Sequence, residues 1–557
     1  MVFIVSALLN FFAAFLALLV LKPMRQRAMA ESCSPARSAS PGSRFPGLMP
    51  HASIAALLES GPPDAPAIGA PGGVRSLSYR ELRALARQTV DTLNALAIGR
   101  GDRVAIVLPN GPEMASSFIA VAAGAATAPV NPGYRAHDLE FYLGDLRPKA
   151  LVLEAGADVP ARAVARKMSI PVLELSADRA RGAGWFTLSS SGAAPGTPSC
   201  GGMGEKDDPA LFLHTSGTTS RPKLVPLLQR NLLASAEHIG RTLALTRDDV
   251  CLNIMPLFHI HGLMAATLSS LAVGGAVFCT PGFNALRFFA WLDEVKPTWY
   301  TAVPTMHQAI LSRAERHRDI LARSRLRFIR SSSASLPAPV MVEMEKVFGV
   351  PVIESYGMTE ASHQMASNPL PPGARKPGSV GLAAGPELAI LDEEWKALPR
   401  GQVGEVSIRG PNVTPGYEAN PEANAKSFRD GWFLTGDQGV LDEEGYLRLT
   451  GRLKELINRG GEKFSPLEVD DVLSSHPAVA QALTFAMPHA KLGEEVAAAV
   501  VLREGASATE RELRDFCAAR LADFKVPRKV VLLTEIPKGA TGKLQRIGLA
   551  QKLGLGS

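Results

Sequence analysis

Cysteine is scarce in this chain and has no metal-binding spacing. Five cysteines occur in 557 residues, and no two of them form a Cys-x-x-Cys pair. An odd number leaves one thiol over from any complete set of disulfides. The sequence therefore predicts a protein of a reducing compartment and gives no sign of a structural zinc site.

The chain also lacks a large excess of charge of either sign. The formal net charge is only +6, and the chain has neither a long Lys/Arg block nor an alternation of basic with aromatic residues. These absences argue against a nucleic-acid partner. What remains is a composition of 46% hydrophobic and 20% charged residues, which is ordinary for a globular protein of two or more domains.

Residues 1–50 differ from the rest and are interpreted as an apolar leader with a flexible linker. The run 2–21 is apolar except for one Ser and one Asn, and three basic residues follow it closely. Its length and flanking charge predict a membrane tether that leaves the folded part in the cytoplasm. A cleaved signal peptide and a true start at Met24 or Met29 are the alternatives. Residues 31–50 are rich in Ser, Pro and Ala, which is typical of a linker.

From His51 onward, short apolar strands alternate with helical stretches, which predicts an α/β protein with mostly parallel sheets. Ser78 and Glu81 form a capping-box pattern for a helix that runs to about Leu96. Strands are expected at 104–108, 150–153, 403–409 and 446–450. After Gly451 the pattern changes to a compact α+β unit, with helices expected at 467–473 and 510–521 and strands at 479–486, 496–502 and 529–533.

The most informative stretch is residues 213–227, LHTSGTTSRPKLVPL. An apolar strand at 210–213 leads into a loop of small and hydroxylated residues, namely Thr215, Ser216, Gly217, Thr218, Thr219 and Ser220. Backbone N–H groups of such a loop can form an anion nest, and Lys223 adds a positive charge. The order Gly-Lys-Ser/Thr of a Walker loop is missing. The loop favours a polyphosphate cradle, although a solvated turn is the commoner fate of this composition.

Two downstream motifs carry carboxylates. Residues 355–360, SYGMTE, follow an expected strand at 350–353, where α/β sheets bind ligands. There Glu360 could hold a hard cation such as Mg²⁺, and Thr359 could donate to a phosphate oxygen. Residues 432–437, WFLTGD, place Asp437 after an expected Gly turn, where its carboxylate could accept two hydrogen bonds from a ribose diol. Alone, each motif also fits an ordinary turn.

Two further motifs lie in the C-terminal hundred residues. Residues 452–463, RLKELINRGGEK, join the two expected domains, and the Gly-Gly pair suits a hinge. Residues 537–543, PKGATGK, place Lys543 on a Gly-flanked loop from which it could reach a charged centre in the other domain. Alone, these segments also fit a plain linker and a solvated lysine.

In this combination and order, the five motifs resemble the acyl-adenylate-forming, or AMP-binding, superfamily of acyl-CoA synthetases, aryl-CoA ligases and firefly luciferases. The resemblance covers about His51 to the end, and Ser220 and Leu224 replace two glycines of the family pattern TSGTTGxPKG. It implies a large N-terminal domain, residues 51–451, of layered sheets and helices with a small β-barrel-like part. A smaller, mobile α+β domain, residues 452–557, is implied to follow.

The resemblance also implies a two-step reaction with ATP, Mg²⁺ and coenzyme A. A carboxylate attacks the α-phosphate of ATP to give acyl-AMP, and the thiol of coenzyme A then attacks the acyl carbonyl. The implied ATP and AMP contacts are Thr215, Ser216, Gly217, Thr218, Thr219, Lys223, Tyr356, Asp437 and Arg452. The implied metal ligands are Glu360 and Thr218, and the implied catalytic residues are Lys543, His259 and Thr359. Lys454 is the implied hinge, and the implied contacts to coenzyme A are Arg459, Gly460, Gly461 and Glu462.

Several residues favour a small, polar acid. Ser355 stands where relatives that take aryl or fatty acids often have Gly, so it should shorten the acid pocket. His363 lies three residues after Glu360 and is expected on the same side of a following helical turn. The His and Ser residues at 259–261 and 331–333 add donors that suit a second carboxylate.

The run 356–381, YGMTEASHQMASNPLPPGARKPGSVG, closely resembles the oxalate–CoA ligases of plants and fungi. That resemblance implies contacts to the distal carboxylate from Ser333, His363 and one of His259 or His261, and oxalyl-CoA as the product. A medium-chain or 4-coumarate-type CoA ligase is the nearest alternative. A non-catalytic nucleotide-binding protein and a tethered protein whose leader is the functional part are alternatives of other classes.

Overall fold

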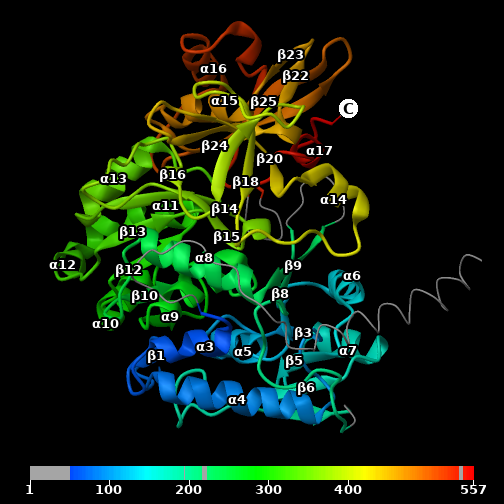
Figure 1. The fold of residues 1–557 in the computed structure, drawn as a ribbon. Helices are drawn as coiled ribbons and strands as arrows, with labels where there is room; N and C mark the ends of the chain where they lie inside the picture. Colours follow the sequence, from blue (N-terminus) through cyan, green and yellow to red (C-terminus); the bar gives the residue numbers. More distant parts are fainter. Residues whose placement is uncertain (1–50, 193–194, 216–221, 538–543, 557) are drawn as a thin grey trace, which may run out of the picture.

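The computed structural model describes residues 51–192, 195–215, 222–537 and 544–556, and Figure 1 shows their arrangement. One large sheet has seven strands in the order β7-β6-β5-β3-β4-β8-β9. Its inner strands are parallel, whereas β7 and β9 join antiparallel at the edges. The strands are β3 Arg103–Val107, β4 Ala126–Pro129, β5 Ala150–Glu154, β6 Val172–Ala177, β7 Phe186–Ser191, β8 Pro209–His214 and β9 Leu224–Leu228.

The second large sheet has nine strands in the order β16-β15-β14-β13-β12-β10-β11-β1-β2. Its central strands are parallel, and antiparallel strands close both edges. The strands are β1 Pro66–Gly69, β2 Leu77–Ser78, β10 Val250–Asn253, β11 Ala276–Cys279, β12 Trp299–Ala302, β13 Phe328–Ser331, β14 Val352–Met358, β15 His363–Ser367 and β16 Leu382–Ala383.

The two large sheets share one apolar core, which the intervening helices complete. These helices are α3 Ile54–Leu57, η2 Leu58–Ser60, α4 Tyr79–Ala95, α5 Pro112–Ala122, α8 Gln229–Thr242, the π-helix η3 His261–Leu268 and α9 Ser269–Ala272. The outer face of the seven-stranded sheet packs on α6 Ala136–Leu146 and α7 Pro160–Lys167. The outer face of the nine-stranded sheet packs on α10 Phe288–Val295, α11 Pro304–Ala314, η4 Glu315–His317, α12 Arg318–Ala322 and α13 Ala338–Phe348. Helices and sheets therefore alternate in layers, which confirms the predicted α/β class (Figure 1).

The capping box predicted at Ser78 is confirmed. The Ser78 hydroxyl accepts from the Glu81 amide, and the Glu81 carboxylate accepts from the Ser78 amide, so α4 begins at Tyr79. Both contacts satisfy amides that a helix start would otherwise leave unpaired. Apolar side chains recur along one face of α4, and that face is buried in the shared core.

A five-stranded antiparallel sheet follows, at the place where the small β part was expected. Its strands are β17 Glu387–Leu391, β18 Gly404–Arg409, β19 Phe428–Arg429, β20 Trp432–Leu441 and β21 Leu447–Arg452, and α14 Pro421–Ser427 precedes β19. The short helix η6 Leu453–Glu455 then leads into the C-terminal sheet. That sheet comprises β22 Ile457–Arg459, β23 Glu462–Phe464, β24 Val479–His489, β25 Gly493–Leu502 and β26 Lys529–Leu532.

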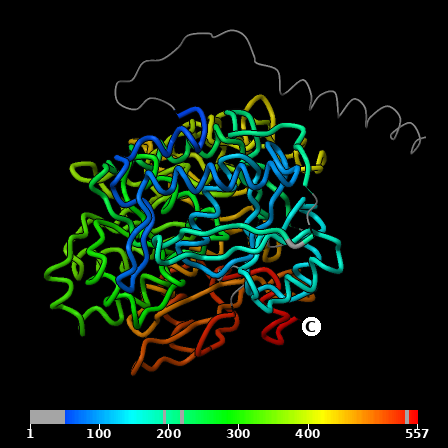
Figure 2. The backbone as a smooth tube through the Cα atoms, turned by 90° about the horizontal axis from the view of Figure 1, so that it is seen from below, coloured from blue at the N-terminus to red at the C-terminus, as the bar shows by residue number. Residues whose placement is uncertain are grey.

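Helices cover the C-terminal sheet on two faces, each with its own apolar cluster. They are α15 Pro466–Ser474, α16 Glu510–Ala518, η7 Asp523–Lys525 and α17 Leu549–Lys552. In Figure 2 this orange-to-red part lies at the opposite end of the molecule from the blue N-terminal segment. It contacts the larger part at α11, where Gln308 Nε2 donates to Ala480 O at 3.3 Å. The α+β unit predicted after Gly451 is confirmed, and the ends of its helices and strands differ from the predicted ones by a few residues.

Two local predictions are wrong. The strand expected at 350–353 is β14, which continues to Met358, so Ser355, Tyr356 and Gly357 lie in the strand and not in a turn after it. Asp437 likewise lies inside β20 rather than after a turn. Gly436 has φ +76° beside a register shift between β18 and β20, so the glycine forms a bulge. Both motifs are strands because their neighbours provide paired edges.

No helix within the described ranges is both long and apolar enough to cross a membrane. Residues 2–21, for which the tether was predicted, lie outside the described part of the chain.

Candidate active site

The predicted phosphate loop connects β8 to β9. Thr215 and Lys223 face each other across its base, where the Thr215 amide donates to Lys223 O at 2.9 Å. The Lys223 amide in turn donates to Thr215 Oγ1 at 3.1 Å. The loop residues between them, Ser216, Gly217, Thr218, Thr219, Ser220 and Arg221, lie outside the described residues.

Tyr417, which the sequence analysis did not single out, contacts both Lys223 and the predicted metal ligand Glu360. The Lys223 Nζ lies 4.1 Å from the centre of the Tyr417 ring, and the Tyr417 hydroxyl donates to Glu360 Oε1 at 2.9 Å. Burial raises the pKa of Glu360, and the Tyr417 hydrogen bond and the Lys223 charge partly oppose that rise. Burial lowers the pKa of Lys223. A cation, a phenol and a carboxylate therefore converge beside the base of the loop.

Tyr356, Asp437 and Arg452 form a second contact group. Asp437 on β20 is the register partner of Arg452 on β21. Arg452 Nε donates to Asp437 Oδ1 at 2.7 Å, and the Tyr356 hydroxyl donates to Oδ2 at 2.5 Å. The Asp437 charge raises the pKa of Arg452, and burial raises the pKa of Tyr356. The structure thus brings together three residues for which the family resemblance implies contacts to the nucleotide.

The predicted hinge Lys454 lies exposed in η6, and its charge contributes to the lowered pKa of Lys223. The neighbouring Glu455 pairs with Arg546, whose Nε lies 3.2 Å from Glu455 Oε2. Lys543, three residues before Arg546, lies outside the described residues. The hinge region therefore lies near Lys223 at the base of the predicted phosphate loop and near the segment that follows Lys543.

The residues predicted to contact coenzyme A belong to one hairpin. Arg459 ends β22 and pairs with Glu495 on β25, with Nη2 to Oε2 at 3.1 Å. Gly460 and Gly461, at φ +63° and +102°, form the turn to β23, which starts at Glu462. The Gly-Gly pair that suggested a hinge is thus a hairpin turn within the C-terminal sheet.

The residues predicted to bind the acid form a polar cluster of two buried histidines and the half-buried Ser333. His261 at the start of η3 has Nδ1 at 3.0 Å from Ser333 Oγ and Nε2 at 2.6 Å from Thr301 Oγ1. The His363 ring lies 5.0 Å, centre to centre, from the His261 ring. Both histidines are 1% exposed. Ser355 adjoins the cluster, because its carbonyl accepts from Ser332 Oγ at 3.0 Å.

His363 reaches this cluster by a different route from the predicted one. The helix after Glu360 is one 3₁₀ turn, η5 Thr359–Ala361, and His363 begins β15. Ser362 and His363 have φ of +50° and +103°, which is strained for residues with a Cβ. The Ser362 carbonyl accepts from Ser235 Oγ at 2.6 Å, and its hydroxyl donates to Asn412 O at 2.9 Å. Buried hydrogen bonds therefore hold the bend that turns His363 inward.

A buried arginine on β13, Arg330, escaped the sequence analysis. It is 0% exposed, and its Nη2 lies 3.2 Å from Gln364 Oε1 and 3.5 Å from His363 Nδ1. Its Nε and Nη1 have no hydrogen-bond partner among the described residues. Burial lowers the pKa of Arg330 to about 9, so the group is still a cation at neutral pH. The local sequence gives no signal for this residue, because residues 327–333, RFIRSSS, are not an apolar run that an arginine would interrupt.

The other two predicted catalytic residues lie at the edges of these groups. Thr359 begins η5, next to Glu360, and its carbonyl accepts from the Ser362 amide at 3.0 Å. His259 lies just before η3, half-buried beside Phe258 at 5.5 Å between ring centres. Tyr417 offered no signal either, because a Tyr after Gly in a loop is typical of many surfaces.

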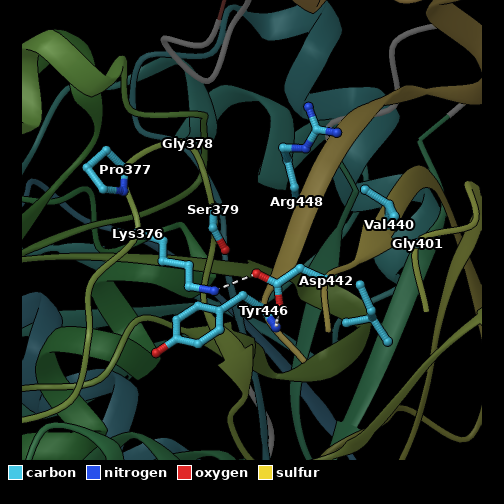
Figure 3. Close-up of a pocket in the computed structure, with 10 residues that line it drawn as sticks. Lys376, Pro377, Gly378, Ser379, Gly401, Val440, Asp442, Tyr446 and Arg448 are labelled. Carbon is cyan, nitrogen blue, oxygen red and sulfur yellow. Dashed lines mark hydrogen bonds and ion pairs between the residues drawn. The ribbon is translucent and has the colours of Figure 1, made fainter. Parts of the chain in front are cut away.

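A separate pocket of about 390 Å³ lies beside β20 and β21 (Figure 3). Lys376 enters it and pairs with Asp442 at 2.6 Å, with Tyr446 and Arg448 nearby. None of the predicted site residues lines it. The described residues also contain no group of three or more His, Cys, Asp or Glu side chains suited to a metal.

Comparison with known proteins finds similar sequences and structures that cover most of the chain. Residues 58–418 match the family described as AMP-binding enzyme, and residues 468–543 match the AMP-binding enzyme C-terminal domain. An oxalate–CoA ligase of Arabidopsis thaliana is 46% identical over 86% of this chain and 94% of the relative. One from Saccharomyces cerevisiae is 41% identical over 82% of this chain and 87% of the relative. The crystal structure of ATP-bound MatB from Rhodopseudomonas palustris superposes with a TM-score of 0.79 at 32% identity, covering 90% of this chain and 99% of that one.

Proposed function

Because this chain belongs to the family of AMP-binding enzymes, as an AMP-forming acid–CoA ligase, we propose that the acid it activates is oxalate. The observation that carries this proposal is the cluster of the buried His261 and His363 with the half-buried Ser333. A second carboxylate can accept hydrogen bonds from such groups, whereas a hydrocarbon tail cannot. An apolar tail accepts no hydrogen bonds, so a polar wall of this kind disfavours it relative to a carboxylate.

The first step forms the acyl-AMP. One carboxylate oxygen of oxalate attacks the α-phosphorus of ATP, and pyrophosphate leaves. Lys223 and the loop that starts at Thr215 hold the phosphates, while Asp437 and Arg452 hold the ribose. Lys543 balances the charge that develops between the carboxylate and the α-phosphate, an effect worth roughly 3–4 kcal/mol for a positioned donor. His259 and Thr359 act beside the same centre.

The second step transfers the oxalyl group. The thiol of coenzyme A loses its proton and attacks the acyl carbonyl, and AMP leaves. The C-terminal domain turns about Lys454 between the two steps, so that Lys543 withdraws and the hairpin from Arg459 to Glu462 approaches coenzyme A. The exposed position of Lys454 in η6 supports this assignment.

Glu360 fits a ligand for Mg²⁺. Mg²⁺ in nucleotide sites is held by one or two carboxylates together with substrate phosphates and water. Glu360 is a buried carboxylate beside the base of the phosphate loop, and its Tyr417 contact occupies only one oxygen. When bound there, Mg²⁺ would neutralise phosphate charge. Thr218 is the second proposed ligand.

Two alternatives to this assignment remain testable. A medium-chain or 4-coumarate-type ligase would prefer bulky acids and tolerate Ser355→Gly. A non-catalytic nucleotide-binding protein would turn over no acid, although Glu360, Asp437, Arg452 and Lys543 are all present. The membrane tether at residues 2–21 and a cytoplasmic place for the catalytic domains stay predictions. Fractionation of the full chain beside a variant lacking residues 1–28 tests the tether.

The experiment for the acid is pyrophosphate release by the full chain with ATP, Mg²⁺ and coenzyme A over oxalate, malonate, acetate, octanoate and 4-coumarate. We expect a preference for oxalate, and a loss of two to three decades in the adenylation rate in Lys543→Ala. Lys552→Ala, an exposed lysine on α17, is the matched control and should change little. A preference for octanoate or 4-coumarate would rule out the diacid pocket.

A further inference from the structure

The nine-stranded sheet buries a positive charge that pairs with no carboxylate of the described residues. Arg330 is completely buried, and the two side chains that its guanidinium contacts, Gln364 and His363, carry no carboxylate. The donors Nε and Nη1 have no hydrogen-bond partner among the described residues. Arginine stays protonated in proteins, and a buried charge is normally paired because leaving water is costly. The acid-free site therefore carries an excess positive charge.

Another buried arginine shows how this chain treats a structural guanidinium. Arg546 has Asp470 Oδ2 at 2.6 Å from Nη2, Glu455 Oε2 at 3.2 Å from Nε and Thr484 O at 2.7 Å from Nη1. Two carboxylates and a carbonyl thus satisfy it. Lack of a carboxylate partner is therefore peculiar to Arg330 in this comparison and is not shared by the buried Arg546.

Arg330 lies on the face of the sheet that bears the acid cluster. It is the register partner of Thr301 on β12, and Thr301 contacts His261. Paired residues of parallel strands point to the same face. The other side of Arg330 meets the start of β15, where Nη2 lies 3.5 Å from His363 Nδ1. Arg330 therefore sits directly behind the residues assigned to the second carboxylate.

The surrounding contacts fix where the guanidinium points. The Gln364 amide nitrogen donates to Thr242 Oγ1 and to Ala384 O, both at 3.1 Å, so its oxygen is left for Arg330. The strained backbone at Ser362 and His363 places the imidazole next to the same nitrogen. With Arg330 as donor toward Nδ1, a neutral His363 carries its proton on Nε2.

We propose that Arg330 determines specificity for a dianionic acid, as a positioning residue that supplies its charge from behind His363. This inference rests on the proposed function, since it concerns the same pocket. The second carboxylate of the acid provides the negative charge that no carboxylate in the described part of the chain supplies. A monoacid of the same size leaves the buried cation uncompensated, which is a penalty against the wrong substrate.

The test compares oxalate with oxamate, in which an uncharged amide replaces the second carboxylate. Pyrophosphate release by the full chain gives kcat/KM for both acids in wild type, Arg330→Met and Arg330→Lys. We expect Arg330→Met to lower kcat/KM for oxalate by at least about 30-fold, as when a buried charge partner is truncated. The value for oxamate should change by less than about 3-fold. Arg330→Lys should keep part of the oxalate preference.

A stability measurement separates this role from a structural one. If Arg330 is an uncompensated charge, Arg330→Met should raise the melting temperature of the acid-free protein while it lowers oxalate selectivity. ATP affinity by calorimetry should stay the same. Arg327→Met is the matched control, because this half-exposed arginine three residues earlier pairs with Asp249 at 3.2 Å. It should leave selectivity unchanged.

The two failures can be told apart. Absence of oxalate turnover in the wild type overturns the proposed function. Oxalate turnover with an oxalate-to-oxamate ratio that Arg330→Met leaves unchanged overturns this inference alone. A lower melting temperature with equal loss for both acids would make Arg330 a structural residue and contradict it as well.

Discussion

Replacing Gly357 by alanine should disable the acid pocket from within β14. A Cβ at this position would lie 1.7 Å from the carbonyl oxygen of His363 and 2.6 Å from its carbonyl carbon. Ordinary contacts begin near 3.4 Å, so β14 and β15 would have to separate by more than about 1 Å. The obstacle is backbone, which has no rotamer with which to move aside. His363, already strained at φ +103°, would be displaced with its strand.

The expected result is a fall of at least about 100-fold in kcat/KM for adenylation, the scale of a 1 Å misplacement in an active site. The melting temperature should fall too. Gly144→Ala is the matched control: it lies within α6, and its new Cβ would meet only Met168 Cε at an ordinary 3.6 Å. That change should stabilise the protein by about 0.5–1 kcal/mol. Near-wild-type adenylation by Gly357→Ala would refute the close approach of β15.

Three further predictions follow from the described contacts. Asp437→Ala should raise KM for ATP and weaken binding in calorimetry, since it removes the partner of both Tyr356 and Arg452; an unchanged KM would exclude Asp437 from the nucleotide site. Arg546→Met should lower the stability by about 3–5 kcal/mol in denaturant unfolding, because Asp470 and Glu455 lose their buried partner; a stabilising effect would contradict the contrast with Arg330. Burial raises the pKa of Glu354 to about 8, so between pH 4.5 and 8 the folded state keeps a proton that the unfolded state has lost. The free energy of unfolding should therefore fall as the pH rises through this range, by up to about 1.4 kcal/mol per pH unit. Glu354→Gln should flatten that decline in melting temperature against pH, and an unaltered slope would show that another group titrates.

The fold could be predicted where a local pattern determines the element. The capping box at Ser78 and Glu81 marks the start of α4 within one residue, because the same side chains make the cap contacts. Three strands of the C-terminal sheet, β24, β25 and β26, were predicted from apolar runs, whereas β22 and β23 were missed because their segment was interpreted as a hinge. The predicted strand at 350–353 ends too early, because the Tyr-Gly-Met that follows has the look of a turn and is held in β14 only by pairing with β15.

The candidate site was predicted only in part, and the reason is also physical. Motif residues such as Asp437 and Arg452 carry signals in the sequence, and β20 and β21 bring them into register. Arg330 and Tyr417 act through neighbours that are distant along the chain. The partners of Arg330 lie on β15 and that of Tyr417 on η5, so nothing in the local pattern marks either residue.

The most direct test of the central claim is identification of the product by mass spectrometry. The full chain is incubated with ATP, Mg²⁺, coenzyme A and an equimolar mixture of oxalate, malonate, acetate, octanoate and 4-coumarate. The account predicts oxalyl-CoA as the dominant thioester, formed with one AMP for each molecule of product. A thioester of octanoate or 4-coumarate in its place, with oxalate unused, would contradict it.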